Sequence, residues 1–282
     1  METGNKLINN SLFWDKRITK NKAQSYQLLI HYSFERFSYC VFDIEKNEFL
    51  GLNSYETKSM NNLNKILNKE LFNWDFQSIK INTQSTKSTI IPTSLFENNI
   101  IEKYLYFNDD FDNYSTAIFS EQLKYIDAMI IYALPKDIIT IFQQKFEKFE
   151  TKSHSSIFID SILRKSAQSK KNEIFIDLST TRFDIGILKK SKLFLYNHFS
   201  FSSKNDFLYY VLNCYNTLNL DPNKDKLHIF GEFKKNEFIQ PLKEYLKHVI
   251  IEKKGTEYSY SNIFNNMPDF YFHKLFNLTT CG

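Results

Sequence analysis

Residues 175–184 read Phe-Ile-Asp-Leu-Ser-Thr-Thr-Arg-Phe-Asp, and residues 29–38 read Leu-Ile-His-Tyr-Ser-Phe-Glu-Arg-Phe-Ser. The two stretches align at a constant offset of 146 residues, which places Ser33 on Ser179 and Arg36 on Arg182. Both have the pattern of a strand that enters a tight turn and continues as a second strand. A repeat of this length is too long for a solenoid unit and matches the size of a domain. The sequence therefore predicts two similar domains that face each other across a cleft.

Around each stretch the sequence predicts the same order of elements, βββαβαβα. The three leading strands are expected over residues 26–34, 38–44 and 48–55 in the first half, and over 173–179, 182–189 and 192–200 in the second. The polar residues 166–171 are the expected linker. We therefore divide the chain into a polar N-terminal segment (1–25), a first domain (26–168) and a second domain (169–282), both of the α/β class.

Three helices have start signals of their own. Ser203 and Asp206 form a capping-box pattern ahead of a helix with an apolar face. Pro241 fits the first turn of the following helix, which we expect over residues 241–248. In the first half, Pro135 is expected to begin a helix in the same way.

Composition argues against several classes of protein. The 282 residues include 36 basic and 32 acidic ones, and their net charge of +4 is spread along the chain, so we expect no nucleic-acid surface. The pairs Lys189-Lys190 and Lys234-Lys235 are expected to be solvated turn residues. Three scattered cysteines suit a reducing compartment. Neither a signal peptide nor a transmembrane run is recognisable, and we expect a cytoplasmic protein.

The glycine content bears directly on phosphate binding. The chain has 6 glycines, whereas an average chain of this length would have about 20 at the usual frequency of about 7%. Loops that cradle phosphates need glycine, because the backbone must approach the anion closely. The sequence therefore disfavours a glycine-rich phosphate loop.

The doubled βββαβαβα pattern resembles the actin-like ATPase superfamily, which includes actin, sugar kinases and the 70-kDa chaperones. The sequences of residues 37–43, 91–96 and 205–210 are similar to those of an uncharacterised bacterial family of pilus-assembly-like proteins. The resemblance covers most of the chain, from about residue 26 to residue 275. It implies two actin-like (ribonuclease H-like) domains around a nucleotide cleft.

The resemblance also implies three motifs that hold Mg-ATP, and this chain departs from each of them. The first hairpin of the superfamily reads Asp-x-Gly, and His31 and Ser33 stand in the places of the aspartate and the glycine. The second reads Asp-x-Gly-Gly-Gly-x-x-Asp, and this chain keeps both aspartates but replaces all three glycines with residues 179–181. The third, a strand followed by two glycines, keeps one of them as Gly231.

The surviving residues make up the candidate site. Asp177 is the candidate catalytic residue, and Asp177 and Asp184 are the candidate metal ligands. Hydroxyl groups can still bind a phosphate, so the candidate cofactor-binding residues are Ser33, Ser179, Thr180, Thr181 and Gly231. Side chains where glycine is usual, together with the lost carboxylate, argue against efficient turnover, because metal-assisted hydrolysis depends on positioned charge.

Each candidate also has a purely structural explanation. Asp177 could bond within its own turn, and Asp184 is expected to pair with Arg182 or to be solvated. A lone histidine at a strand end, such as His31, is more often structural than catalytic. Gly231 fits a turn whether or not a nucleotide lies above it.

Two functions remain open from the sequence. The first is a non-catalytic or degenerate actin-like protein that acts as a cytoplasmic interaction or scaffold module, with protein partners, in an envelope or pilus-like assembly. The alternative is a slow ATPase or ATP-dependent phosphotransferase that uses the cleft, and weak binding of ATP and Mg²⁺ is compatible with both. The apolar patch Leu12-Phe13-Trp14 either binds a partner or packs back on the fold.

Overall fold

A computed structural model describes residues 11–57, 59–85, 87–106 and 115–280. The chain divides into two compact units, each of which contains one copy of the sequence repeat. The first-repeat unit comprises the described residues up to 157 together with 256–266 and 274–280, and the second-repeat unit comprises 158–255 and 267–273. The chain passes from one unit to the other within helix α5 (His154–Lys165). The domain boundary expected at 168/169 stays a prediction.

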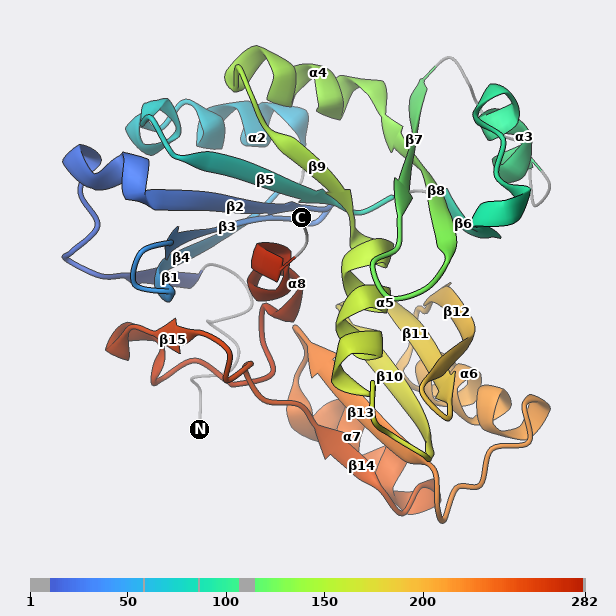
Figure 1. The fold of residues 1–282 in the computed structure, drawn as a ribbon. Helices are drawn as coiled ribbons and strands as arrows, with labels where there is room; N and C mark the ends of the chain where they lie inside the picture. Colours follow the sequence, from blue (N-terminus) through green and yellow to red (C-terminus); the bar gives the residue numbers. More distant parts are fainter. Residues whose placement is uncertain (1–10, 58, 86, 107–114, 281–282) are drawn as a thin grey trace. The chain divides into compact units, whose positions relative to one another are not determined.

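The second-repeat unit is built on a five-stranded sheet with the order β12-β11-β10-β13-β14 (Figure 1). Its strands are β10 (Asn172–Leu178), β11 (Arg182–Lys189), β12 (Lys192–Ser200), β13 (Lys226–Gly231) and β14 (Val249–Ile251). The first three form an antiparallel meander, and β13 and β14 run parallel to β10. Helices α6 (Lys204–Thr217) and α7 (Lys235–Tyr245) contribute to one apolar core with the sheet. On the other face, Gly186 lies so close to Phe158 and Ile162 of α5 that a Cβ would clash.

The first-repeat unit has the larger sheet, with the order β1-β4-β3-β2-β5-β9 and β15 paired to β4. Its strands are β1 (Ser11–Trp14), β2 (Tyr26–Tyr32), β3 (Arg36–Asp43), β4 (Glu48–Glu56), β5 (Ser78–Thr83), β9 (Glu150–Ser153) and β15 (Ser259–Tyr260). Helices α2 (Met60–Leu67) and α4 (Lys136–Lys145) cover one face (Figure 1), where their apolar side chains join the core of the sheet. Short helical segments complete the chain: η1 (Lys20–Ser25), η2 (Glu70–Asn73), η3 (Thr93–Leu95), η4 (Asn98–Ile100), η5 (Asn262–Phe264), α8 (His273–Phe276) and η6 (Asn277–Thr280).

An additional small sheet interrupts the first repeat between β5 and α4. Strands β6 (Lys87–Pro92), β7 (Thr116–Gln122) and β8 (Ala128–Pro135) pair in the order β6-β8-β7, and α3 (Ile101–Tyr106) packs against them. The βββαβαβα order expected for the first half is present as β2-β3-β4-α2-β5-α4-β9-α5, and the small sheet with α3 is an insertion that the sequence did not predict. Pro135 ends β8 and is the N-cap of α4, so the helix begins one residue later than expected, at Lys136.

The internal repeat is confirmed at the level of single residues. Strands β4-β3-β2-β5-β9 and β12-β11-β10-β13-β14 have the same relative order and directions. A bulge interrupts the pairing between Val41 and Phe42 in one unit and between Ile187 and Leu188 in the other. These positions also differ by 146 residues. Both halves are thus α/β units of one plan, as the sequence predicted.

The two start signals of the second unit had different outcomes. The capping box is confirmed, with the Asp206 N–H donating to Ser203 Oγ at 3.1 Å and the Ser203 N–H donating to Asp206 Oδ2 at 3.0 Å. The start at Pro241 is wrong, because α7 begins at Lys235 and the proline lies inside it. Burial of Ile239 and Leu242 on the core side outweighs the single hydrogen bond that the proline removes.

The Leu12-Phe13-Trp14 patch packs back on the fold as edge strand β1. Phe13 stacks on Phe264 with ring centroids 5.7 Å apart, and Trp14 contacts Tyr39 edge-on at 6.3 Å. Only Leu12 of the three stays well exposed. Among the described residues, no helix has the length and apolar character needed to cross a membrane.

Candidate functional site

The hairpin between β2 and β3 carries the first candidate, Ser33. The Ser33 N–H donates to the Arg36 carbonyl at 2.8 Å, and the Arg36 N–H donates to Ser33 Oγ at 3.1 Å. The Ser33 side chain is buried, whereas Phe34 at the tip of the turn is 59% exposed. Ser33 therefore uses its backbone amide and its hydroxyl to close the turn.

The hairpin between β10 and β11 repeats this turn in the second unit. The Ser179 N–H donates to the Arg182 carbonyl at 2.8 Å, and the Ser179 hydroxyl donates to the same oxygen at 3.0 Å. Thr180 and Thr181 are exposed at the tip. None of residues 33–35 and 179–181, all of which are described, has a positive φ. The backbone of both turns thus does not adopt the positive φ values for which glycine is usually required.

Asp177 and Asp184 lie directly opposite each other on β10 and β11, and each is 1% exposed. The hydroxyl of Tyr196 donates to Asp184 Oδ1 at 2.8 Å, and Arg182 Nη2 lies 3.5 Å from the same oxygen. The pairing of Asp184 with Arg182 is the one expected from the sequence. Tyr196, whose role the sequence did not suggest, comes from the neighbouring strand β12 and is brought there by the register of the meander.

Gly231 ends β13 next to Asp177, and its backbone explains why no other residue stands there. Its φ is +118°, and a Cβ would lie 2.1 Å from the Leu178 carbonyl oxygen and 2.9 Å from Asp177 Oδ1. Its N–H donates to the Phe270 carbonyl at 2.8 Å. In the first unit the matching position, paired with Tyr32 as Gly231 is with Leu178, is Thr83. The close approach of β10 and β13 thus requires glycine here, whether or not a ligand is bound.

His31 stands near the end of β2, in the place where the resemblance implies an aspartate. Its side chain is 6% exposed, and its ring lies 6.1 Å from that of His154, centroid to centroid. Burial, helped by the charge of Lys274, holds the pKa of His31 well below its usual range, so the imidazole is neutral at pH 7. A neutral imidazole cannot supply the negative charge that an aspartate would offer to a metal-water cluster.

His31 belongs to a group of buried polar side chains at the ends of β2 and β5. Asn82 and Thr83 are completely or almost completely buried beside it. The Asn82 side chain is the polar neighbour of the His31 ring, and within the described part of the chain Thr83 Oγ1 has no hydrogen-bond partner. Buried polar atoms of this kind usually bind ordered water or a small polar molecule. The first-repeat unit thus keeps an uncharged polar centre where the resemblance implies an acidic one.

The predicted site residues are divided between the two units. Asp177, Asp184 and Gly231 adjoin one another in the second-repeat unit, at the strand ends that lead into the turn of residues 179–181. Ser33 lies in the first-repeat unit. Among the described residues, no group of three or more His, Cys, Asp or Glu side chains is arranged to hold a metal ion.

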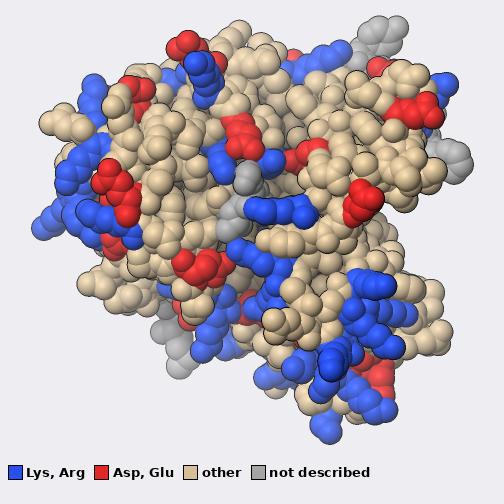
Figure 2. Space-filling view, viewed as in Figure 1, with Lys and Arg blue, Asp and Glu red and all other residues tan. Residues whose placement is uncertain are grey.

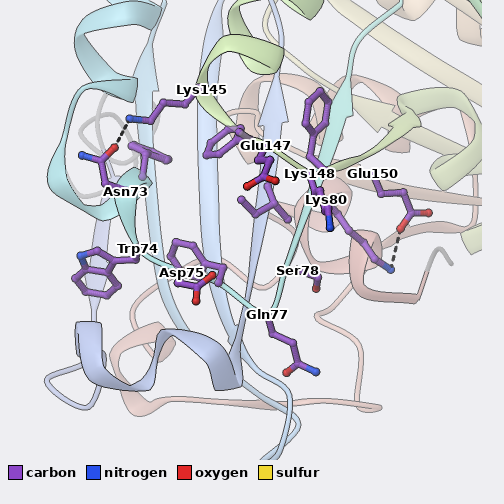
Figure 3. A pocket seen from close by; sticks show the side chains of 15 residues that line it. Asn73, Trp74, Asp75, Gln77, Ser78, Lys80, Lys145, Glu147, Lys148 and Glu150 are labelled. Carbon is purple, nitrogen blue, oxygen red and sulfur yellow. Dashed lines mark hydrogen bonds and ion pairs between the residues drawn. The ribbon is translucent and has the colours of Figure 1, made fainter.

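A groove in the first-repeat unit was not foreseen from the sequence (Figure 3). It has a volume of about 920 Å³ and lies between residues 72–80, which lead into β5, and residues 145–150, which join α4 to β9. Its lining includes five aromatic residues, Phe72, Trp74, Phe76, Phe146 and Phe149. Lys145 donates to Asn73 Oδ1 across it at 2.6 Å, and burial lowers the pKa of this lysine. None of the predicted site residues lines this groove.

A strand edge is open beside the groove. Ser78 and Ile79 begin β5 and pair with Gln27 and Leu28 of β2, but β9 pairs only with the part of β5 from Lys80 onward. The sequence pattern that could have pointed here is the run Phe72-Asn73-Trp74-Asp75-Phe76, whose aromatic residues recur every second position.

A family model matches residues 15–249, which is most of the chain. The chain belongs to the DUF3822 family. The family is described as proteins of unknown function. No curated protein matches the chain.

Solved structures show that this member of the DUF3822 family has the actin-like ATPase fold. A Bacteroides thetaiotaomicron protein with that fold and unknown function is 22% identical with a TM-score of 0.76, over 83% of this chain and 93% of its own. A chain of the PilM–PilN type IV pilus biogenesis complex is 7% identical with a TM-score of 0.64, over 92% and 98%. The cytoplasmic domain of Vibrio cholerae EpsL, an inner membrane component of the type II secretion system, is 9% identical with a TM-score of 0.48, over 92% of this chain and 96% of its own. At these identities the likeness concerns the fold alone.

Proposed function

We propose that this DUF3822 protein is a cytoplasmic protein-binding module for an assembly, built on an actin-like fold whose nucleotide site no longer supports turnover. The observation that carries the proposal is the matching turn in both repeats. Ser33 and Ser179 each close their hairpin with their own amide and hydroxyl. Those amides are therefore engaged within the turn, whereas a phosphate cradle needs loop amides that point to the anion.

The charge at the site supports the same conclusion. His31 is a buried neutral imidazole where the resemblance implies a carboxylate. Asp184 is held by Tyr196 and Arg182, so this carboxylate is engaged within its own meander. Mg²⁺ is usually held through carboxylates and substrate phosphates. The residues present therefore fit a Mg-nucleotide poorly, and we derive no catalytic step through one.

The groove of the first-repeat unit supports a binding role. The register of β9 leaves the start of β5 at Ser78 and Ile79 without a neighbouring strand on that side, and aromatic side chains lie beside it. Extended peptides commonly bind by adding a strand to such an edge, while neighbouring pockets select their side chains. The PilM–PilN complex contains a chain of the same fold in pilus biogenesis. We infer that this chain holds a partner segment in a comparable envelope or pilus-like assembly.

Site-directed photo-crosslinking in the native cell tests this proposal. A photoreactive residue is placed at Gln77 or Lys148, two exposed positions that line the groove (Figure 3). The matched control is Gln240, an exposed residue of α7 in the other unit. We expect one discrete protein adduct from both groove positions and none from the control. Adducts of equal yield at all three positions, or none at the groove, would contradict the proposal.

A further inference from the structure

The topology of the second-repeat unit gathers eight of its lysines at one edge of the sheet. The parallel strands β10, β13 and β14 all begin at this edge, and the β11–β12 turn lies there too. We call it the lysine edge, and it consists of Lys170, Lys171, Lys189, Lys190, Lys192, Lys224, Lys226 and Lys247. Figure 2 shows a gathering of Lys and Arg where Figure 1 draws these strands. Charge that is scattered along the sequence is thus concentrated by the fold.

Contacts within the unit keep the separate segments of the lysine edge together. The hydroxyl of Ser191 lies 2.6 Å from the carbonyl oxygens of Ser166 and Ser169, which holds the segment before β10 against the β11–β12 turn. The Lys247 N–H donates to the Pro222 carbonyl at 3.0 Å, which joins the segment before β14 to the turn before β13. The pairing of β10 with β13 joins these two pairs of segments, so the lysines lie on one continuous edge.

Most of these charges are not neutralised within the protein. Within the described part of the chain, no ion pair involves Lys170, Lys171, Lys190 or Lys192, all of which are exposed. The acidic groups nearby are engaged elsewhere. Asp221 pairs with Lys224 at 3.0 Å, and the buried Asp225 accepts a hydrogen bond from Asn172. Glu173 lies 3.6 Å from His228 Nε2. The exception is Glu244, which is exposed in the last turn of α7. The edge has a clear excess of positive charge.

The backbone of the β11–β12 turn is strained in a way that presents one of these lysines. Lys190 and Ser191 have φ values of +51° and +64°. A two-residue turn of this type favours Asn-Gly, and a residue with a side chain in the left-handed region costs about 1 kcal/mol. The corresponding turn of the first-repeat unit is longer and has only Asn47 at positive φ. The second unit thus accepts a cost that places Lys190 at the tip of the turn.

Two exposed aromatic residues flank the lysine edge. Phe194 of β12 is 52% exposed and carries the Lys189 ammonium 3.7 Å above its ring, and Tyr245 at the end of α7 is 56% exposed. Exposed lysines on flexible stems act as point charges and suit a diffuse anionic surface, whereas the planar arginine fork matches a single phosphate in a bidentate way. Aromatic rings beside such lysines are typical of surfaces that lie at the headgroup level of a membrane.

From this arrangement we propose that the lysine edge binds the surface of a membrane rich in anionic phospholipids, with Phe194 and Tyr245 at the level of the headgroups. The attraction is electrostatic and falls off within a Debye length, so it weakens as salt is added. This inference does not depend on the partner groove or on the state of the nucleotide site.

Vesicle co-sedimentation of the full chain tests the proposal. The parent protein should sediment with phosphatidylserine-containing phosphatidylcholine vesicles and stay in solution with pure phosphatidylcholine. The variant K171A/K190A/K192A should bind the anionic vesicles about 100-fold more weakly, since each lysine near such a surface contributes about fivefold. The control K16A/K22A/K65A removes the same charge from exposed positions of the other unit and should bind like the parent.

Several outcomes would overturn the proposal. These are equal binding to neutral vesicles, an equal loss in the two triple variants, or no loss on raising salt from about 0.05 M to about 0.5 M. A short DNA duplex and a single-stranded RNA are the competing anions. Tight binding of either one without binding to anionic vesicles would assign the lysine edge to nucleic acid instead. Circular dichroism of both triple variants checks that each is folded.

Discussion

At the scale of single residues, the site differs from the superfamily pattern at a few side chains, and the residues around each of these side chains suit the difference. His31 is not an aspartate that was simply replaced, because Asn82 and Thr83 beside it are also uncharged and buried. Asp184 is bound by Tyr196 and Arg182 from its own meander. Gly231 remains because a Cβ would collide with the Leu178 carbonyl. Its survival in the sequence is therefore not evidence for a bound adenosine.

The buried histidine makes a prediction about pH. Because the pKa of His31 is lowered in the folded protein, the unfolded chain takes up a proton near pH 6.5 that the folded chain does not. The contribution of neutral His31 to the free energy of unfolding is therefore fully present above that pH. It falls as the pH drops below that value, by up to about 1.4 kcal/mol per pH unit. Urea unfolding at several values between about pH 7.5 and about pH 5.5 measures this slope.

The control for this prediction is His31→Gln, which keeps a polar side chain of similar size but does not titrate. We expect the slope between these pH values to be smaller in His31→Gln than in the parent by close to the contribution of one proton. Identical slopes in the two proteins would show that His31 is protonated in the folded state as readily as in the unfolded one, and would contradict its assignment as a neutral buried group.

At the scale of elements, the sequence predicted the meanders well and the connections poorly. Strand–turn–strand patterns around Ser33 and Ser179 recur with the same alternation, so their pairing could be predicted from local sequence alone. The small sheet of β6, β7 and β8 could not, because a short apolar strand has the same pattern whichever sheet it joins. The predicted start of α7 at Pro241 was wrong, because burial of Ile239 and Leu242 in the core outweighed the preference of proline for the first turn of a helix.

The β11–β12 turn makes a prediction at this scale. Asn tolerates the left-handed region better than lysine, so Lys190→Asn should raise the free energy of unfolding by about 0.5 kcal/mol. The matched control is Lys192→Asn, two residues later in strand β12 and outside the left-handed region, which should not stabilise the protein. Urea unfolding of the two variants compares them directly. A loss of stability in Lys190→Asn would mean that the lysine itself makes a stabilising contact at the tip.

At the scale of the whole molecule, the repeat and the fold could be predicted from the sequence, and the distribution of charge could not. The constant offset of 146 residues predicted the internal repeat and supported the resemblance to the actin-like fold. Both predictions are confirmed. The segments that carry the lysine edge are about 20 to 35 residues apart along the chain, and they meet because the parallel strands start at one edge of the sheet. The aromatic groove likewise depends on two distant segments.

The central claim is that an actin-like frame is retained without a working nucleotide site, and thermal unfolding with and without Mg-ATP tests it most directly. The measurement uses the parent protein and Asp177→Ala, at about millimolar nucleotide. A ligand at 100 times its Kd stabilises a protein by about 2.7 kcal/mol, which corresponds to about 5 °C in Tm for a chain of this size. We predict that neither protein shifts by more than about 1 °C. A shift of about 5 °C in the parent that Asp177→Ala abolishes would contradict the claim and favour the slow ATPase or phosphotransferase instead.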